Sequence, residues 1–444
     1  MAAGVAIQTP EHIGVSTDPG VNKAGMALQS GSAHEAGAAG ETAGAASTAS
    51  SGSLNPALRG LVPGTRSNGL LRVVLGVFAF GFSLIIFAQL MRIHGVGIDL
   101  EIPLRAAQRW VDGGQPYLAS SFDAPPGPDL PFLYPPFVLP ILAPLLWLPR
   151  EAVLLGWVVV CALGSAWGMR RLGIPWAWTI VVMTWPPFAE GIIGGNVQVL
   201  LFAAFVALFY ARVPGRGPLA GNALPIHRDP TTPDTPALRE GLLAATVAAL
   251  KVSQLHAWMY LLLRRPRAAL LGVLVLGAVV LATLPITGID VWFEWLAQVR
   301  RAADPEWRIG GLALEKFLPQ AVALGITVAS IVALLFVPRE RAGSWVGVLA
   351  VVGALSLHIY GILFMLGAWL LVRREIGLVG AMLVAWFTVP GVWAGILLVA
   401  AAWALGATRY PWLLEPRREP AAVTAVVRQA AGPGEAGPGG RSAT

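Results

Sequence analysis

The stretch VVLGVFAFGFSLIIFAQL, residues 73–90, decides the fold class. It contains no charged side chain, and its length suits a helix that crosses the hydrocarbon layer, for which about 20 apolar residues are needed. Uncharged apolar runs also occupy residues 271–284 and 391–405. A water-soluble core has no need of several such runs. The sequence therefore predicts an integral membrane protein with several spans.

The composition of the whole chain agrees with this prediction. Of its 444 residues, 56% are hydrophobic and 12% are charged, whereas soluble domains carry about 25% charged residues. The formal net charge of +7 is typical of arginines that flank spans on the cytoplasmic side, so we expect no nucleic-acid partner. The single cysteine, Cys161, excludes an intrachain disulfide and argues against a cysteine-based metal centre.

The apolar segments predict an all-α, polytopic membrane domain over residues 67–412, with about twelve transmembrane helices in a range of ten to twelve. The expected spans are about 70–90, 132–149, 151–169, 174–190, 196–211, 241–262, 268–287, 312–337, 343–357, 359–372, 376–389 and 391–408. Residues 1–66 are rich in Ala, Gly, Ser and Thr and lack the apolar core of a signal peptide. We interpret them, and residues 413–444, as disordered tails.

The placement of arginines predicts the orientation. Arginine-rich segments precede the first span, follow the last one, and lie at 264–267, 339–341 and 373–374. With twelve spans all of these fall on one side, which the positive-inside rule makes cytoplasmic. The same count places Arg170 and Arg171 outside, against the rule unless they pair with lipid phosphate. The segments left on the outer face are 91–131, 212–240 and 288–311.

Two of these outer segments have a helical period. In residues 99–112 and again in 290–301, apolar side chains recur at spacings of three and four opposite polar and charged ones. Both patterns predict amphipathic helices that lie in the outer membrane interface. The segment 212–240 is instead rich in proline and has the composition of a linker.

Several polar residues stand where the membrane makes them costly. Asp99 follows the first span, where desolvation can tune a carboxylate as a general base, but it also suits the N-cap of a helix beginning at Leu100. Lys251 lies inside an apolar segment, so it faces a cavity or snorkels to the interface. Glu190 and Asn196 bracket a glycine-rich break. We favour capping for Glu190 and leave Asn196 open between capping and a cavity.

The histidines of the apolar segments are open as well. A lone histidine inside the membrane is more often a packing or hydrogen-bonding residue than a ligand. This is the preferred interpretation of His256. His358, taken by itself, is interpreted in the same way. The outer arginines would grip phosphates or simply meet lipid headgroups. They are Arg105, Arg109, Arg300, Arg301 and Arg308.

The order of short motifs along residues 90–375 resembles glycosyltransferase family 87. The motifs are Asp99 with its amphipathic helix, Gly-Gln-Pro-Tyr at 114–117, Tyr-Pro-Pro-Phe at 134–137, Gly-Gly-Asn-Val-Gln-Val-Leu-Leu at 194–201, Ala-Leu-Lys-Val at 249–252 and Ser-Leu-His-Ile-Tyr at 356–360. The pair Val252-Ser253 departs from the prolines that members often have nearby. Members are enzymes of the GT-C type, among them polyprenol-phosphate-mannose-dependent α-mannosyltransferases of the cell envelope.

The resemblance implies a GT-C fold and a function. The enzyme would transfer a hexose, mannose first of all, from a polyprenyl-phosphate donor to a glycolipid or lipoglycan acceptor, with inversion, on the outer side of the plasma membrane. Asp99 would be the general base, with His358 and Lys251 on the donor phosphate. The substrate cavity would be lined by Tyr134, Asn196, Gln198 and Tyr360. Apart from the lipid-phosphate co-substrate, no cofactor and no metal is implied.

Other functions stay open on the sequence alone. A lipid-linked arabinofuranose donor would suit the same fold. A secondary transporter or lipid flippase would carry internal repeats with matching broken helices, and we find no convincing self-similarity. A non-catalytic membrane scaffold would not need Asp99. No phosphate-binding loop, dinucleotide fingerprint or zinc-protease motif occurs in the chain.

Overall fold

The computed structural model describes residues 67–93, 96–123, 128–212, 224–251, 254–302, 311–312, 314, 317–354, 356–386 and 388–415. The expected tail 1–66 and residues 416–444 of the expected tail 413–444 lie outside the described residues. Leu413 ends a 3-10 helix and Leu414 forms a β-bridge with Val372, so the second tail begins after these residues. The described residues form α-helices and short 3-10 helices, with two isolated β-bridges and no strand, which confirms the all-α prediction. The α-helices are α2 (Ser67–Ile93), α3 (Ile98–Val111), α4 (Val138–Leu142), α5 (Arg150–Arg171), α6 (Trp176–Met183), α7 (Pro186–Ile193), α8 (Gln198–Phe209), α9 (Ala237–Leu250), α10 (His256–Arg264), α11 (Pro266–Thr287), α12 (Ile289–Ala302), α13 (Gln320–Ala333), α14 (Ala342–Val352), α15 (Leu366–Trp369), α16 (Arg374–Ala385) and α17 (Val389–Thr408). The 3-10 helices are η1 (Ala119–Asp123), η2 (Ala143–Trp147), η6 (Leu334–Phe336), η7 (Arg339–Arg341), η8 (Ile359–Met365) and η9 (Pro411–Leu413).

Four of the described helices are long and apolar enough to cross a membrane. They are Gly69–Gln89 within α2, Arg150–Arg171, Pro266–Thr287 and Val389–Thr408. In α2 and α11 only 6% and 11% of this apolar stretch is buried against the rest of the protein. Such exposed apolar surface suits a lipid environment. The expected count of about twelve spans is not reached by this measure.

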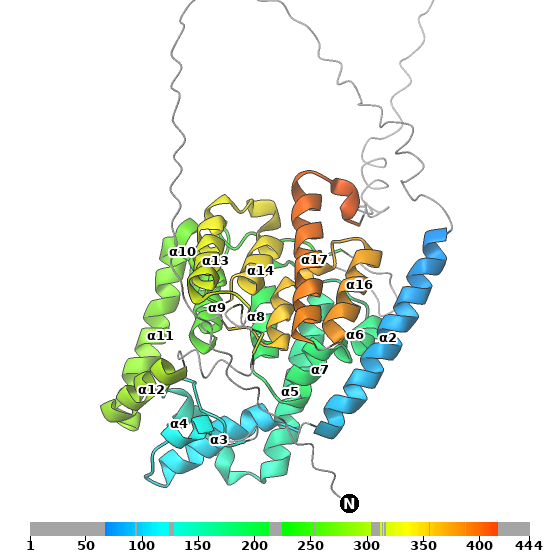
Figure 1. The fold of residues 1–444 in the computed structure, drawn as a ribbon. Coiled ribbons are helices and arrows are strands. Elements are labelled where there is room, and N and C mark those ends of the chain that lie inside the picture. The colour runs from blue at the N-terminus through cyan, green and yellow to red at the C-terminus, as the bar shows by residue number, and fades with distance from the viewer. Residues whose placement is uncertain are drawn as a thin grey trace, which may run out of the picture. The chain divides into compact units, whose positions relative to one another are not determined.

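The described structure has two ends, and long helices such as α2 and α11 run from one end towards the other (Figure 1). We call the first the arginine end. Its members are Arg171, Arg228, Arg265, Arg341 and Arg373, which hydrogen bonds join to the backbone around them. We call the second the α3 end. There α4 and η2 pack on α3, and α12 reaches the same group through Trp295, which donates to the Leu133 carbonyl at 3.0 Å.

The segment expected as a span at 132–149 does not run from end to end. Its helices α4 and η2 pack along α3, and Arg150, just after it, donates to Glu101 Oε2 at 2.7 Å. Five prolines between residues 135 and 149 remove backbone donors and interrupt a continuous helix. Helix α5 therefore begins at the α3 end and carries Arg170 and Arg171 to the arginine end. The conflict in the predicted orientation disappears.

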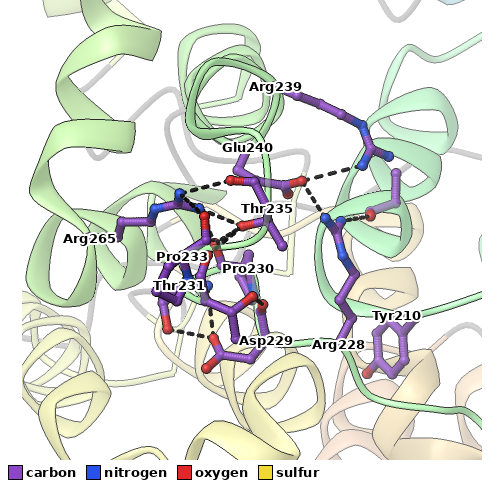
Figure 2. A network of polar contacts seen from close by, with 12 residues as sticks. Tyr210, Arg228, Asp229, Pro230, Thr231, Pro233, Thr235, Arg239, Glu240 and Arg265 are labelled. Carbon is purple, nitrogen blue, oxygen red and sulfur yellow. Dashed lines mark hydrogen bonds and ion pairs between the residues drawn. The ribbon is translucent and has the colours of Figure 1, made fainter.

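The segment 212–240, expected on the outer face, is also corrected. Its described part lies beside Arg265, which donates to the Pro230 carbonyl at 3.2 Å and to the Thr235 carbonyl at 2.8 Å. Arg228 pairs with Glu240 at 2.6 Å in the same network (Figure 2). This segment therefore lies at the arginine end, together with the arginine-rich loop that the sequence analysis placed on the opposite side.

The expected span 241–262 forms a hairpin instead of a single crossing. Helix α9 ends at Leu250 and α10 begins at His256, and the far ends of both helices lie at the arginine end. Helix α9 has 14 residues, so it rises about 21 Å, which is less than the roughly 30 Å of the hydrocarbon layer. The chain turns back at Lys251 instead of completing a crossing.

A second hairpin joins α14 to η8 and α15. Gly347 lies against the Phe364 carbonyl, while Gly343 and Gly367 both lie against Tyr210, so the two arms are antiparallel. The turn falls between Val352 and Ile359, at the boundary between the expected spans 343–357 and 359–372. The tips of both hairpins point away from the arginine end.

The core that holds these hairpins is centred on α8. Nearly every side chain of α8 is buried, as expected of a helix that is apolar all round. The ring of Phe205 lies 4.8 Å from that of Phe209 and 5.1 Å from that of Phe364 in η8, centroid to centroid. Aromatic packing of this kind fixes the second hairpin against α8.

Candidate functional site

The candidate site forms where the start of α3 meets the loop between α7 and α8. The Gly97 amide donates to the Ile193 carbonyl at 2.7 Å, and the Asp99 amide donates to the Gly194 carbonyl at 2.7 Å. Gly97 and Gly195 have φ angles of 76° and 71°, which glycine adopts without steric cost. A Cβ atom on Gly194 would lie 3.1 Å from Asp99 Oδ2. Glycine in this loop therefore lets the first turn of α3 approach closely.

Asp99 is oriented by Asn196. Asn196 Nδ2 donates to Asp99 Oδ2 at 2.8 Å. Asn196 Oδ1 accepts from the Gln198 amide at 2.9 Å, so the same side chain also turns the chain into α8. Helix α3 begins at Ile98 with Gly97 as its N-cap, which excludes the N-cap interpretation of Asp99. The partly buried carboxylate faces the loop.

Lys251 and His358 meet on the ring of Tyr360. Lys251 Nζ lies 5.8 Å from the ring centroid, within the range of a cation–π contact. The His358 ring stacks on Tyr360 with centroids 5.4 Å apart and planes inclined by 13°. The opposite charges of Lys251 and Asp99 are close enough to attract. Lys251 and the His358–Tyr360 pair come from the tips of the two hairpins, so two separate parts of the chain are brought to Asp99.

Tyr134 and Gln198 complete the predicted group. Asp99 lies near enough to the hydroxyl groups of Tyr134 and Tyr360 for its charge to act on them. The Tyr134 carbonyl accepts a hydrogen bond from the Tyr117 hydroxyl at 2.7 Å. Gln198 is buried and meets the site through its backbone amide. The structure thus brings together all seven residues that the sequence analysis proposed, from five separate stretches of the chain. Their roles stay predictions.

Glu190 is a further member of the group that the sequence analysis assigned to helix capping. It lies inside α7, whose N-cap and C-cap are Trp185 and Gly194, so the capping interpretation is wrong. Its Oε2 atom is covered and has no hydrogen-bond partner among the described residues. Asp99 lies near enough for its charge to act on the Glu190 carboxyl group. The available signal was a carboxylate inside the apolar run 185–193, which is costly in a membrane.

Trp157 is the other residue that the sequence did not reveal. Its indole Nε1 donates to the Gly195 carbonyl at 2.7 Å and holds the glycine loop from the side of α5. Cys161, one turn later, lies with its Sγ 3.9 Å from the Asn196 carbonyl. A tryptophan in an apolar helix looks the same in sequence whether it faces lipid or a loop, so no pattern distinguishes this one.

The outer flank of α3 carries ion pairs instead of free phosphate ligands. Glu101 accepts from Arg150 at 2.7 Å and from Arg105 at 3.0 Å, and Arg105 also binds Asp129 at 2.7 Å. Burial alone would raise the pKa of Glu101, but the hydrogen bonds from Arg150 and Arg105 outweigh it and hold this pKa below its ordinary value. A surface cleft lies beside these pairs and not beside Asp99.

The remaining outer arginines differ in their surroundings. Arg109 donates to the Pro116 carbonyl at 3.1 Å and so holds the Gln-Pro-Tyr turn. Burial lowers its pKa. Arg300 and Arg301 are exposed at the end of α12, and Arg308 lies outside the described residues. The two expected amphipathic helices are confirmed as α3 and α12.

His256 is a packing and hydrogen-bonding residue, as the sequence analysis favoured. It is buried in α10, and its Nε2 lies 2.7 Å from Ser330 Oγ of α13. This contact ties the first hairpin to α13. Among the described residues, no three His, Cys, Asp or Glu side chains gather in a group that could hold a metal ion.

The comparison with protein families supports the resemblance in part of the chain. The model of glycosyltransferase family 87 matches residues 132–317. This range includes Tyr134, Glu190, Asn196 and Lys251, and it leaves out Asp99 and the second hairpin. No curated protein and no solved structure matches the chain. Residues 132–317 are thus similar to glycosyltransferase family 87, and the match indicates a membrane glycosyltransferase.

Proposed function

We propose that the protein transfers a hexose, mannose in the first instance, from a polyprenyl-phosphate donor to a hydroxyl of an envelope glycolipid or lipoglycan. Asp99 is the general base, and Lys251 and His358 bind the donor phosphate. Tyr134, Asn196, Gln198 and Tyr360 line the cavity. The reaction uses no cofactor besides the lipid-phosphate sugar.

One observation carries this proposal. A carboxylate held by an amide lies near an ammonium group, and this ammonium group and an imidazole contact the same aromatic ring. Glycosyl transfer from a lipid phosphate requires a base for the acceptor hydroxyl and cationic or hydrogen-bonding groups for the departing phosphate. The arrangement supplies both, on a chain whose family match indicates a glycosyltransferase.

The chemistry follows from these positions. Asp99 takes the proton of the acceptor hydroxyl as its oxygen bonds to the anomeric carbon. The bond from that carbon to the phosphate oxygen breaks, and the phosphate leaves with the electron pair. A phosphate is a good leaving group, so no general acid is needed. Attack from the face opposite the phosphate inverts the anomeric centre.

The proposed orientation places this site on the outer side of the plasma membrane. The arginine-rich segments, now including Arg171 and Arg228, gather at one end, which the positive-inside rule makes cytoplasmic. Asp99 lies at the opposite end, the α3 end, where α12 exposes Phe293 and Leu296. An amphipathic helix with exposed apolar side chains suits the lipid interface through which a lipid-linked sugar must arrive.

Two alternatives remain as outcomes of the experiment. An arabinofuranose donor uses the same base and the same phosphate ligands. A transporter needs repeats of inverted topology whose broken helices enter from opposite sides. Both hairpins described above return to the arginine end, which favours the transferase.

The test is sugar transfer by the purified protein in lipid nanodiscs. Radiolabelled polyprenyl-phosphate mannose and a crude envelope glycolipid fraction are supplied to the wild type, to Asp99→Asn and to Asp112→Asn, an exposed acid at the end of the same helix. We expect labelled glycolipid from the wild type and Asp112→Asn, and a rate about 10²–10⁴-fold lower from Asp99→Asn. Wild-type activity that survives Asp99→Asn removes the base. Product only with an arabinose donor corrects the sugar, and no product with either donor refutes the transferase.

A further inference from the structure

The acidic and the basic side chains of the candidate site come from different elements, and we call Asp99 and Glu190 its acidic wall. Asp99 and Glu190 come from α3 and α7, which hydrogen bonds at Gly97 and Gly194 hold together. The cation and the imidazole come from the two hairpin tips, where both contact the ring of Tyr360. A donor phosphate is attracted to the hairpin tips and repelled by the carboxylates. The acidic wall is therefore the place for the other substrate, whose reacting group is neutral.

The proposed reaction needs only one base, which leaves Glu190 without a part in it. Its Oε2 is covered and makes no hydrogen bond with the described residues, while the charge of Asp99 acts on it. Gly191, the next residue, lies against Tyr360, with 3.3 Å between the position of an added Cβ and the Tyr360 Cβ. Glu190 is thus beside the group that holds Asp99, on a short helix between α2 and the core.

A carboxylate in this position is costly unless something uses it. Two negative charges near each other repel, and an apolar environment strengthens the repulsion. Carboxylate oxygens accept strong hydrogen bonds from hydroxyl groups. A sugar presents several hydroxyls on one ring, so a second carboxylate beside the base can hold a hydroxyl next to the one that reacts.

We propose that Glu190 accepts a hydrogen bond from a second hydroxyl of the acceptor while Asp99 deprotonates the first. The acceptor is then a polyol, such as a sugar headgroup, and not a lipid alcohol or a side chain with a single hydroxyl. Glu190 is in this sense a specificity-determining residue. The inference rests on the proposed function for the identity of the reaction, but binding of a polyol at the acidic wall can be measured without any transfer.

The experiment compares Glu190→Gln and Glu190→Ala with the wild type in nanodiscs. Glu294→Gln is the matched control, because Glu294 on α12 also has a covered Oε2 without a partner among the described residues but lies outside the site. The probes are octyl α-D-mannopyranoside, its monodeoxy analogues, and octyl tetraethylene glycol ether as an amphiphile with no sugar ring. Binding is titrated without donor, and transfer is then measured with labelled polyprenyl-phosphate mannose.

We expect Glu190→Ala to weaken octyl mannoside binding and to raise its KM about tenfold or more, the effect of one hydrogen bond to a charged group. The donor KM and the melting temperature should stay within twofold and about 2 °C of the wild type. One monodeoxy analogue should show the same loss with the wild type and no further loss with Glu190→Ala. Glu190→Gln, which keeps an acceptor oxygen, should lose less than Glu190→Ala. Glu294→Gln should change none of these quantities.

The outcomes separate the two proposals. Transfer by the wild type with equal octyl mannoside KM in Glu190→Ala overturns the role of Glu190 and leaves the transferase intact. Equal losses on every deoxy analogue, or a change in donor KM and stability together, mean that Glu190 is structural and also overturn the proposal. Sugar-specific binding that Glu190→Ala abolishes, without transfer from any donor, supports the polyol site and refutes the transferase.

Discussion

Glu240 and Glu190 lie in the same protein at opposite ends and are treated in opposite ways. Glu240, in the first turn of α9, is fully buried and pairs with Arg228 at 2.6 Å and with Arg239 at 3.3 Å (Figure 2). Glu190 lies near another acid, Asp99, and no ion pair among the described residues neutralises it. The Oε2 atom of each glutamate is covered and makes no hydrogen bond with the described residues, so the two differ in the charge of their neighbours. At the arginine end the protein neutralises its own charges. At the candidate site two acids lie near each other, while the ion pairs of the α3 end are confined to the flank of α3.

The comparison predicts opposite effects of charge removal at the two ends, and the largest effect should come from Lys251. Lys251→Met removes the cation at the first hairpin tip, so kcat/KM for the donor should fall about 10²–10³-fold. Stability should stay unchanged or rise, because an ammonium group inside an apolar segment costs free energy. Donor kinetics and thermal melting in nanodiscs measure both. A loss of stability without loss of transfer would reverse the comparison at this residue.

Removing Glu240 should have the second largest effect, on stability. Glu240→Ala leaves Arg228 partly buried without its carboxylate, and breaking such a pair costs about 3–5 kcal/mol. The fraction of folded protein should fall, while the transfer rate per folded molecule stays within about twofold. The double variant Arg228→Met/Glu240→Leu, which removes both charges, should recover most of the loss. If the double variant does not recover the loss, Arg228 and Glu240 contribute to stability through packing and not through charge pairing.

A smaller effect is expected at the glycine that lets α3 approach. In Gly194→Ala the new Cβ would lie 2.9 Å from the Glu190 carbonyl and 3.1 Å from Asp99 Oδ2. The aspartate must shift, so kcat should fall about tenfold, as expected when a reacting group is displaced by a fraction of an ångström. Gly156→Ala on α5 is the control, because no atom lies within 4 Å of its added Cβ. Equal rates for both variants would show that Asp99 tolerates the shift.

The smallest effect concerns pH. The pKa of Glu101 is lowered, since hydrogen bonds from Arg150 and Arg105 outweigh burial. Its stabilising contribution is therefore complete above the unfolded-state pKa of about 4.3 and is lost as the pH falls through the lower folded-state value. We expect the wild type to lose about 1 kcal/mol more than Glu101→Gln when the pH falls from 6 to 3. Melting temperatures of both proteins over this range test it, and parallel curves would contradict it.

The sequence predicted local structure better than it predicted the path of the chain. The period in residues 99–112 and 290–301 predicted α3 and α12 nearly to their ends, because one apolar face dictates a helix wherever it packs. The path failed at two places. An apolar run with five prolines, 132–149, lies along α3, and the run 241–262 folds back at Lys251. Hydropathy measures how much apolar surface a segment has, and it does not reveal whether the segment returns.

The candidate site followed the same pattern. Asp99, Lys251 and His358 were singled out because their charge or their motif is unusual in an apolar chain. Glu190 was equally unusual and was assigned to a cap, because the sequence places it next to a glycine-rich break without showing that α7 continues to Ile193. Trp157 was missed because its contact with the Gly195 carbonyl depends on how α5 and the loop pack.

The hairpin formed by α9 and α10 has a consequence for biogenesis. Neither arm is long enough to be released into the bilayer as an independent span, and the turn between them carries a lysine. The pair is stable in the membrane only after α8 and α11 stand on either side of it, where Gly241 and Gly272 allow α9 and α11 to touch backbone to backbone. We therefore expect α11 to be synthesised before Lys251 takes its final position in the membrane. A nascent chain that ends before α11 therefore contains Asp99 but does not yet hold Lys251 in its final position.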